Sequence, residues 1–296
     1  MIDIKNVIIG CGDVGRRIAL QLIESNEARD SILGLVQTAN SLNACGALGI
    51  ECMLFDLDEV LDGQGDHAQL LNQVRCYYLV PPQKIGFEDE RSRALLTWFT
   101  ENKIQPSKVV LVSTTGVYGD CDGEWVSEKT PTNPQTERGK RRLSSERQWT
   151  NFSEAESIPI TILRVPGIYA HSRIPVKRIE QGIPVVTANE CGFTNRIHAD
   201  DLAAIAIKAM QDNVNLGIFN ATDGTPGKIS EYLQTVAEVL GKPPLPEISM
   251  MQAQGQLSSG MLSYLGESRR ISNTRILKEL KVTLRYPDFR QGLKSG

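Results

Sequence analysis

The sequence predicts an α/β protein built on a doubly wound parallel sheet, with a smaller, partly interleaved C-terminal domain. Short apolar runs rich in β-branched residues alternate with helical patterns as far as Arg164, which is typical of repeated β–α units. Beyond Arg164 this alternation loosens, and Gly and Pro become frequent over residues 166–184. We therefore expect a sheet domain over residues 1–165 with contributions from about 194–222, and a smaller domain formed by 166–193 and 223–296.

The individual elements follow from hydrophobic periodicity. Residues 6–9 are expected to form a buried strand, and a helix follows from about Val14, in which Val14, Ile18 and Leu22 recur at i+4. Further strands are expected at 31–36, 51–55, 76–80, 108–112 and 160–164, with helices near 68–74, 88–102 and 138–152. The remainder predicts helices near 200–210, 229–240 and 274–280, a strand at 217–220, and a mobile flap over 250–269.

Composition excludes several classes of function. The 296 residues carry 32 Lys and Arg against 35 Asp and Glu, a net charge of −3 that favours neither nucleic acid nor anionic lipid as a partner. No apolar run of transmembrane length and no signal peptide is apparent, so we expect a cytoplasmic protein. The cysteines form no C-x-x-C pair, and we expect reduced thiols and no metal site; they are Cys11, Cys45, Cys52, Cys76, Cys121 and Cys191.

A glycine-rich turn between the first strand and the first helix carries the clearest functional signal. It has the pattern G-x-G-x-x-G and consists of Gly10, Cys11, Gly12, Asp13, Val14 and Gly15. In this context the first glycine permits a tight turn, the second lets a pyrophosphate approach the backbone, and the third lets helix and strand pack closely. The turn predicts a Rossmann-type dinucleotide-binding domain. Cys11 lies near a helix N-terminus, which favours the thiolate, although a small residue that fits the turn is the simpler interpretation.

The choice between NAD and NADP stays open at this point. The second strand ends at Gln37 and Thr38, which supply neither a carboxylate for a ribose hydroxyl nor an arginine for a 2′-phosphate. We therefore expect discrimination of less than about 100-fold between the two cofactors. Other expected cofactor contacts lie at the carboxyl ends of the third and fourth strands, namely Asp56, Leu57, Val80, Pro81 and Pro82.

Four further segments resemble the short-chain dehydrogenases/reductases, specifically the extended NAD-dependent epimerases and dehydratases. They are V-S-T-T-G-V-Y-G-D at 112–120, I-L-R-V-P-G-I-Y at 162–169, R-I-H-A-D-D-L-A at 196–203 and I-S-N-T-R-I-L at 271–277. This resemblance implies an NAD(P) cofactor, a small polar substrate such as a nucleotide sugar, and a homodimer. It also implies cofactor contacts from Ser113, Val165, Gly167 and Ile168, and substrate contacts from Thr115, Asn195 and Arg196.

The catalytic residues of that family are a Ser or Thr, a Tyr and a Lys, and this sequence matches them only in part. Thr114 falls on the Ser/Thr position. One alignment register places Arg138 at the tyrosine and Arg142 at the lysine, whereas a second keeps Lys140 as the lysine and puts Thr136 at the tyrosine. In both registers the phenol is missing, so Tyr118 and Tyr169 are the alternative phenols, and we take Thr114, Tyr118 and Lys140 as the candidate catalytic set.

Two functions therefore remain in competition. The first is an NAD(P)-dependent oxidoreductase or epimerase/dehydratase with a non-standard active site. The second is a catalytically silent NAD(P)-binding sensor or scaffold, which the loss of the Tyr–Lys pair permits. The basic run at 138–142 is a candidate for binding an anionic group in either case.

Overall fold

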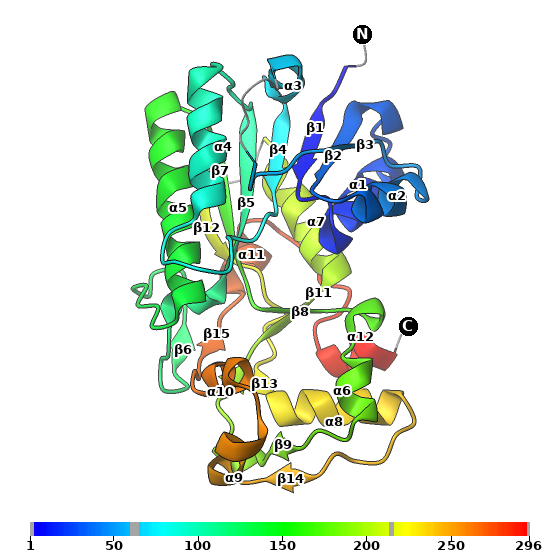
Figure 1. Cartoon of the computed structure of the whole chain (residues 1–296), viewed down its shortest axis with the longest axis vertical. Coiled ribbons are helices and arrows are strands. Elements are labelled where there is room, and N and C mark those ends of the chain that lie inside the picture. Colours follow the sequence, from blue (N-terminus) through cyan, green and yellow to red (C-terminus); the bar gives the residue numbers. More distant parts are fainter. Residues whose placement is uncertain (1–2, 60–64, 213–215, 295–296) are drawn as a thin grey trace.

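The computed structural model describes residues 3–59, 65–212 and 216–294, and its centre is a seven-stranded parallel sheet. The strand order is β12-β7-β5-β4-β1-β2-β3, with every neighbouring pair parallel (Figure 1). These strands are β1 (Asn6–Ile9), β2 (Ile32–Val36), β3 (Cys52–Leu54), β4 (Arg75–Tyr78), β5 (Lys108–Thr114), β7 (Ile160–Val165) and β12 (Gly217–Asn220). The order reverses between β1 and β4, so the predicted doubly wound, Rossmann-type fold is confirmed.

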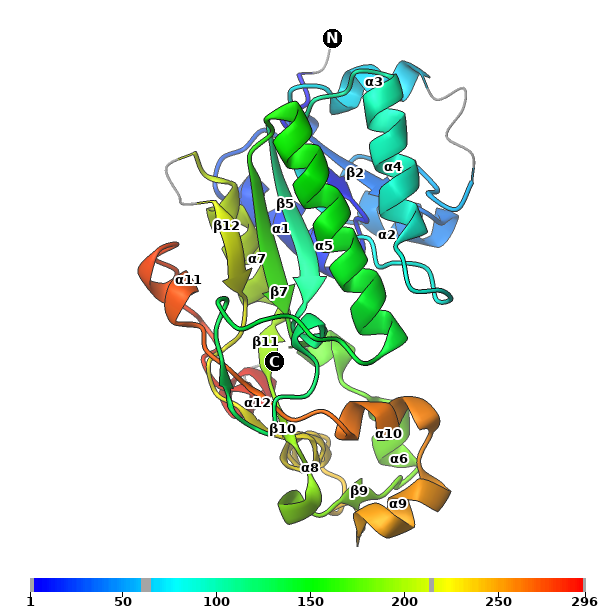
Figure 2. The same ribbon diagram turned by 90° about the vertical axis from the view of Figure 1, so that its left-hand side faces the viewer.

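Helices cover both faces of this sheet. On one face lie α1 (Asp13–Glu24), α2 (Ala39–Gly46) and α7 (Ala199–Met210), and on the other α3 (Gly65–Leu71), α4 (Glu90–Glu101) and α5 (Glu137–Glu156) (Figures 1 and 2). Each face has its own apolar core, since strand residues alternate between them: Ile8 belongs to the first core, and Val7 and Ile9 to the second. None of the described helices is long and apolar enough to cross a membrane.

Short strand pairs and helices form a second body below the carboxyl ends of the sheet strands (Figure 1). The pairs are β8 (Gly167–Tyr169) with β11 (Arg196–His198), β9 (Val185–Val186) with β14 (Glu247–Ile248), and β10 (Phe193–Thr194) with β13 (Gly227–Lys228). The helices are α6 (Val176–Glu180), α8 (Ile229–Val239), α9 (Met250–Gln256), α10 (Ser259–Leu265) and α12 (Phe289–Lys294).

The C-terminal segment also returns to the sheet. Strand β15 (Arg270–Ile271) pairs with β6 (Trp125–Val126), and α11 (Thr274–Lys278) follows it. Arg275 of α11 donates a hydrogen bond to the Ile218 carbonyl of β12 at 2.6 Å, and Ile276 is buried in the first core. The part of 223–296 around α11 therefore packs on the sheet, which the expected domain division did not anticipate.

Some sequence expectations are wrong in detail. Residues 250–269, expected as a mobile flap, contain α9 and α10, because Ser249 and Ser258 cap these helices and Ala253 and Leu265 bury their apolar sides. Helix α2 was not expected at all, since its eight residues show little apolar periodicity. The helix expected near 68–74 is α3, which begins earlier, at Gly65, and ends at Leu71. The strand expected at 76–80 ends at Tyr78, before Pro81.

Candidate functional site

The glycine turn lies at the carboxyl end of β1 and opens α1. Gly10 has a φ of +86°, and the amides of Gly10 and Cys11 both donate to the Leu35 carbonyl at 3.0 Å. A Cβ on Gly10 or on Gly15 would lie 3.0 Å from a neighbouring side-chain carbon, whereas a Cβ on Gly12 would meet nothing closer than the Gly10 carbonyl at 4.0 Å. The outer glycines are thus required by the turn and its packing, while the middle one faces open space.

The side chain of Cys11 is directed into the protein. It is fully buried, with its Sγ 3.9 Å from the Sγ of Cys45. The neighbouring Cys52 thiol and burial raise the pKa of Cys11 above its usual value. A buried Cys11 with a raised pKa agrees with the simpler interpretation of this cysteine as a small residue that fits the turn.

A cavity of about 660 Å³ lies over the glycine turn at the carboxyl edge of the sheet. Its size is typical of a small-molecule or cofactor site. The expected cofactor residues that line it are Gly10, Cys11, Gly12, Asp13, Val14, Gly15, Gln37, Asp56, Leu57, Val80, Pro81, Pro82, Ser113, Val165 and Ile168. Two of the expected cofactor residues do not line this cavity. Thr38 caps α2, with its Oγ1 accepting a hydrogen bond from the Ser41 amide, and Gly167 lines a neighbouring cavity.

Charged side chains surround the end of the cavity next to β2. Gln37 donates from Nε2 to Asp56 Oδ1 at 3.0 Å and to Asp58 Oδ2 at 3.1 Å. Arg91 forms an ion pair with Asp58, and this hydrogen-bonded guanidinium lowers the pKa of Asp58. Asp56 and Arg91 both line the cavity. This end is therefore more strongly charged than Gln37 and Thr38 suggested.

A second cavity of about 240 Å³ adjoins the first. The two share Thr114, Gly116, Arg138 and Pro166 as lining residues. The second cavity is also lined by Thr115, Gly167, Phe193, Thr194, Asn195, Tyr264, Glu267 and Arg269. A large cavity thus lies over the glycine turn with a small one beside it, and the two meet at the end of β5.

Thr114 is the last residue of β5 and lies at this junction. Its Oγ1 accepts a hydrogen bond from the Gly116 amide at 3.2 Å, which caps the short helical turn Thr115–Tyr118. Since a hydroxyl can accept and donate at once, the Thr114 proton remains available to a bound group.

The basic run on α5 separates the two alignment registers. Arg138 and Arg142 line the large cavity one helical turn apart, and Arg138 also lines the small one. Lys140 is exposed, lines neither cavity, and lies 5.4 Å from the centre of the Phe87 ring. Thr136 caps α5. The geometry favours the register with Arg138 and Arg142, and it does not bring the candidate Lys140 into the site.

Arg142 is held in place by the strand ends. Its Nη1 donates to the carbonyls of Val80 and Val112, each at 3.1 Å. Burial lowers the pKa of Arg142 relative to an exposed arginine. Arg141 donates to the Gly86 carbonyl at 2.6 Å. These bonds fix two guanidinium groups at the wall of the large cavity, whereas Arg138 is exposed and free to meet a ligand.

The two alternative phenols lie outside both cavities. Tyr118 is 1% exposed, donates from its hydroxyl to Asn220 Oδ1 at 2.8 Å, and has a pKa raised by burial. Tyr169 is also buried, in the core of the second body, and burial raises its pKa. Tyr264 of α10, in contrast, lines the small cavity. No sequence motif pointed to Tyr264, because it lies in the segment expected to be a flap.

The expected substrate contacts are only partly brought to the site. Asn195 lines the small cavity, but its side chain donates to the Arg269 carbonyl and accepts from the Ile271 amide. Arg196 lines neither cavity; it is 5% exposed and stacks 4.1 Å from the centre of the Tyr232 ring. We correct the Arg196 expectation, since this guanidinium stacks on an aromatic ring within the core and reaches neither cavity, with its Nη2 buried without a hydrogen-bond partner.

Sequence reasoning missed two charged residues of the small cavity. Glu267 and Arg269 line the small cavity and form an ion pair of 2.8 Å, and the Glu267 Oε1 is buried without a hydrogen-bond partner.

His198 caps α7, accepting at Nδ1 from the Asp200 amide at 3.2 Å, and burial lowers its pKa. Asp200, in the first turn of α7, pairs with Arg17.

Part of the chain that includes this site matches the model of a known protein family. Residues 90–221, which hold β5, α5, β7, α7 and β12, match the model of the NAD dependent epimerase/dehydratase family. The resemblance to this epimerase/dehydratase family is confirmed. The matched segment contains Thr114, Arg138 and Arg142, while the glycine turn precedes it.

Three individual proteins show how this chain resembles known sequences and structures. "Epimerase family protein SDR39U1 homolog, chloroplastic" from Arabidopsis thaliana is 22% identical over 203 residues, which cover 64% of this chain and about half (55%) of that protein. A functionally unknown conserved protein from Silicibacter pomeroyi has a TM-score of 0.82 and 28% identity, covering 98% of this chain and 97% of its own. UDP-glucuronic acid 4-epimerase from Bacillus cereus in complex with NAD shares the fold, with a TM-score of 0.76 and 17% identity over 98% of this chain and 96% of its own.

Proposed function

We propose that the chain binds a nicotinamide dinucleotide in the large cavity and acts on a small polar substrate in the small one, as an oxidoreductase or epimerase/dehydratase. The observation that carries this proposal is the open space at Gly12, at the N-terminus of α1, because only a residue without a Cβ leaves room there for a pyrophosphate. The family description and the NAD complex of the Bacillus cereus epimerase support the same cofactor.

The residues around the large cavity fit a dinucleotide along its length. The amides of the glycine turn and the start of α1 would hold the pyrophosphate, and Gln37 and Asp56 would face the adenosine ribose. Pro81 and Pro82 would contribute packing rather than hydrogen bonds. When bound, the cofactor would supply hydride transfer, and the protein's part is to orient the reacting groups.

The small cavity supplies the polar groups for a substrate. Thr114 would donate its hydroxyl proton to a substrate oxygen, and Arg138 would bind an anionic group such as a phosphate or carboxylate. The unpartnered Oε1 of Glu267 is an acceptor for a substrate hydroxyl. Because arginine is always protonated, Arg138 cannot act as a base, and Tyr264 is the phenol best placed for proton transfer.

A catalytically silent dinucleotide-binding protein is the second candidate. Two points favour it: one alignment register places Arg138 at the position of the family's tyrosine, and no tyrosine among the described residues lines the large cavity. In that case the same cavity would bind the dinucleotide and report its presence to a partner. We also keep the homodimer implied by the family resemblance as a proposal, to be tested by light scattering of the purified chain.

Calorimetric titration with NAD, NADH, NADP and NADPH tests the proposal directly. We expect at least one of them to bind, Gly12→Val to abolish binding in a folded protein, and Gly12→Ala to weaken it less, since a methyl group occupies less of the pyrophosphate space. The bound form would then be screened against sugar nucleotides and simple carbonyl compounds. Unchanged affinity in a folded Gly12→Val variant would show that the cavity assignment is wrong, and tight binding without turnover would favour the silent protein.

A further inference from the structure

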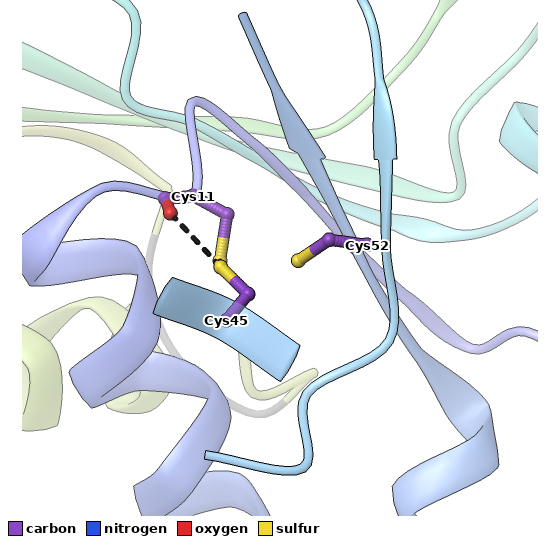
Figure 3. A group of neighbouring side chains, drawn as sticks. All are labelled: Cys11, Cys45 and Cys52. Carbon is purple, nitrogen blue, oxygen red and sulfur yellow. Dashed lines mark hydrogen bonds between the residues drawn. The ribbon is translucent and has the colours of Figure 1, made fainter. Parts of the chain in front are cut away.

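Three cysteines that lie far apart in the sequence meet behind the glycine turn. Cys11 belongs to the turn itself, Cys45 to α2, and Cys52 is the first residue of β3 (Figure 3). Their Sγ atoms all lie within 4.8 Å of one another, and Cys45 Sγ is 3.9 Å from Cys11 Sγ. All three are free thiols. Three soft ligand atoms thus converge on one point, although no spacing in the sequence indicates it.

The neighbouring strand leaves the room that this cluster needs. Gly34 lies in the middle of β2, which is buried along its whole length. A Cβ at Gly34 would lie 3.0 Å from the Sγ of Cys11 and closer still to the Sγ of Cys52. Glycine weakens the interior of a strand and often marks a close approach of another group. Here the group that approaches is the pair of sulfur atoms.

The chemistry of the cluster favours one class of ligand. Thiolates select soft cations such as Cu(I) and Zn(II). Structural zinc sites are almost always four-coordinate, and among the described residues no fourth His, Cys, Asp or Glu joins this group. Cu(I) accepts three thiolates in a trigonal arrangement. Arg16 supplies a positive charge that acts on both Cys45 and Cys52 and would offset part of the negative charge of the bound form.

The three cysteines differ in solvent exposure. Cys11 and Cys45 are 0% exposed, which protects them from exchange with solvent thiols, whereas Cys52 is partly exposed. A cation could therefore enter by way of Cys52. We propose that Cys11, Cys45 and Cys52 form a Cu(I) site that ties the glycine turn to α2 and β3. Cys11 is the one residue that this site shares with the lining of the dinucleotide cavity, since Cys45 and Cys52 do not line it. The proposal does not depend on the proposed function.

Competition with a chromophoric Cu(I) chelator tests the site, using the reduced full-length chain without oxygen. We expect one Cu(I) per chain and a thiolate-to-copper charge-transfer absorption in the near ultraviolet. Cys45→Ser and Cys52→Ser should each lower the affinity by at least about 100-fold, the upper end of what changes outside the ligand shell produce. Cys121→Ser is the matched control, because Cys121 is a partly exposed cysteine outside the cluster, and it should bind like the parent.

A measurement on the unaltered chain keeps the test independent of folding in the variants. Cu(I) at one equivalent should slow iodoacetamide alkylation of Cys52, read by peptide mass spectrometry, and leave Cys121 unchanged. The proposal is overturned if the parent takes no Cu(I) from the chelator, if Cys121→Ser loses as much affinity as Cys52→Ser, or if Cu(I) does not protect Cys52 selectively.

Discussion

Glu146 of α5 and Arg164 of β7 form a buried ion pair with a separation of 2.7 Å, and each side chain is 5% exposed. The carboxylate also accepts a hydrogen bond from the Ser113 hydroxyl of β5 at 2.5 Å. The guanidinium in turn lies 4.8 Å from the centre of the Tyr118 ring. The pair therefore joins α5 to β5 and β7, two of the strands whose ends line the large cavity.

We expect Glu146→Ala to lower the free energy of unfolding by about 3–5 kcal/mol, because it leaves the buried Arg164 charge without its partner. Glu146→Gln should cost less, since the amide oxygen can still accept a hydrogen bond. Urea denaturation measures both, with Arg147→Ala on the exposed side of the same helix as the control. A loss below about 1 kcal/mol for Glu146→Ala would show that water or relaxation satisfies Arg164.

Asp56 gives a reason to expect a cofactor preference that Gln37 and Thr38 did not suggest. Its carboxylate lines the cavity and is fixed by Gln37, whereas the charge of the neighbouring Asp58 is paired with Arg91. We expect NAD to bind more tightly than NADP, because the 2′-phosphate would meet the Asp56 carboxylate. Asp56→Asn should reduce the ratio of the two affinities by at least about tenfold, or 1.4 kcal/mol.

Calorimetry with both cofactors measures this ratio, and Glu59→Gln, an exposed acid outside the large cavity, is the control. An unchanged ratio in Asp56→Asn would place the ribose elsewhere. Equal effects of the two substitutions would instead indicate a long-range electrostatic effect.

Thr114 should matter for turnover and little for cofactor binding. We expect Thr114→Val to lower kcat at least about tenfold for any substrate found, since removing a preorganised donor to a developing charge typically costs about 100- to 1000-fold. Tyr264→Phe should also lower kcat, because its phenol lines the same small cavity.

The contrast with Tyr118→Phe makes this prediction specific. Tyr118 is buried and bonded to Asn220, so its loss should leave kcat nearly unchanged and cost about 1 kcal/mol of stability. Steady-state kinetics with each variant decides the matter. Full activity in both Thr114→Val and Tyr264→Phe would place the chemistry on other residues.

The sequence allowed the sheet and the glycine turn to be predicted because both depend on local patterns. Apolar runs and helical periodicity repeat every few residues, and the role of each glycine follows from its distance to the next. The ion pair of Asp58 with Arg91, the position of Tyr264 and the thiol cluster around Cys52 depend instead on contacts between distant segments. Nothing in the spacing of these residues reports those contacts.

Arg196 and Lys140 are residues that sequence motifs placed at the site but that the structure does not bring there. Both were chosen because a motif placed them near the site, yet one stacks on Tyr232 in the core and the other faces solvent beside Phe87. A motif fixes the position of a backbone, and the direction of a long side chain depends on which neighbours can stack with it or pair with it.

Asp223 makes stability depend on pH. It is 4% exposed, its Oδ1 accepts from the Thr225 amide at 3.0 Å, and its Oδ2 has no hydrogen-bond partner. Burial raises the pKa of Asp223 from 3.8 to about 7. The folded state therefore binds more protons than the unfolded state between about pH 4 and pH 7, so the contribution of this residue to stability is lost as pH rises through that range.

We expect Asp223→Asn to remove this dependence, because the amide cannot ionise. Relative to the parent, the variant should gain stability as pH rises from 5 to 8, by about 3 kcal/mol at most, because the folded-state titration spans about two pH units of this range. Urea denaturation of both proteins at pH 5, 6, 7 and 8 measures the difference, and Asp30→Asn, on an exposed aspartate, is the control. A difference that does not change with pH would show that Asp223 ionises in the folded protein as easily as in the unfolded chain, with Arg196 offsetting the effect of burial.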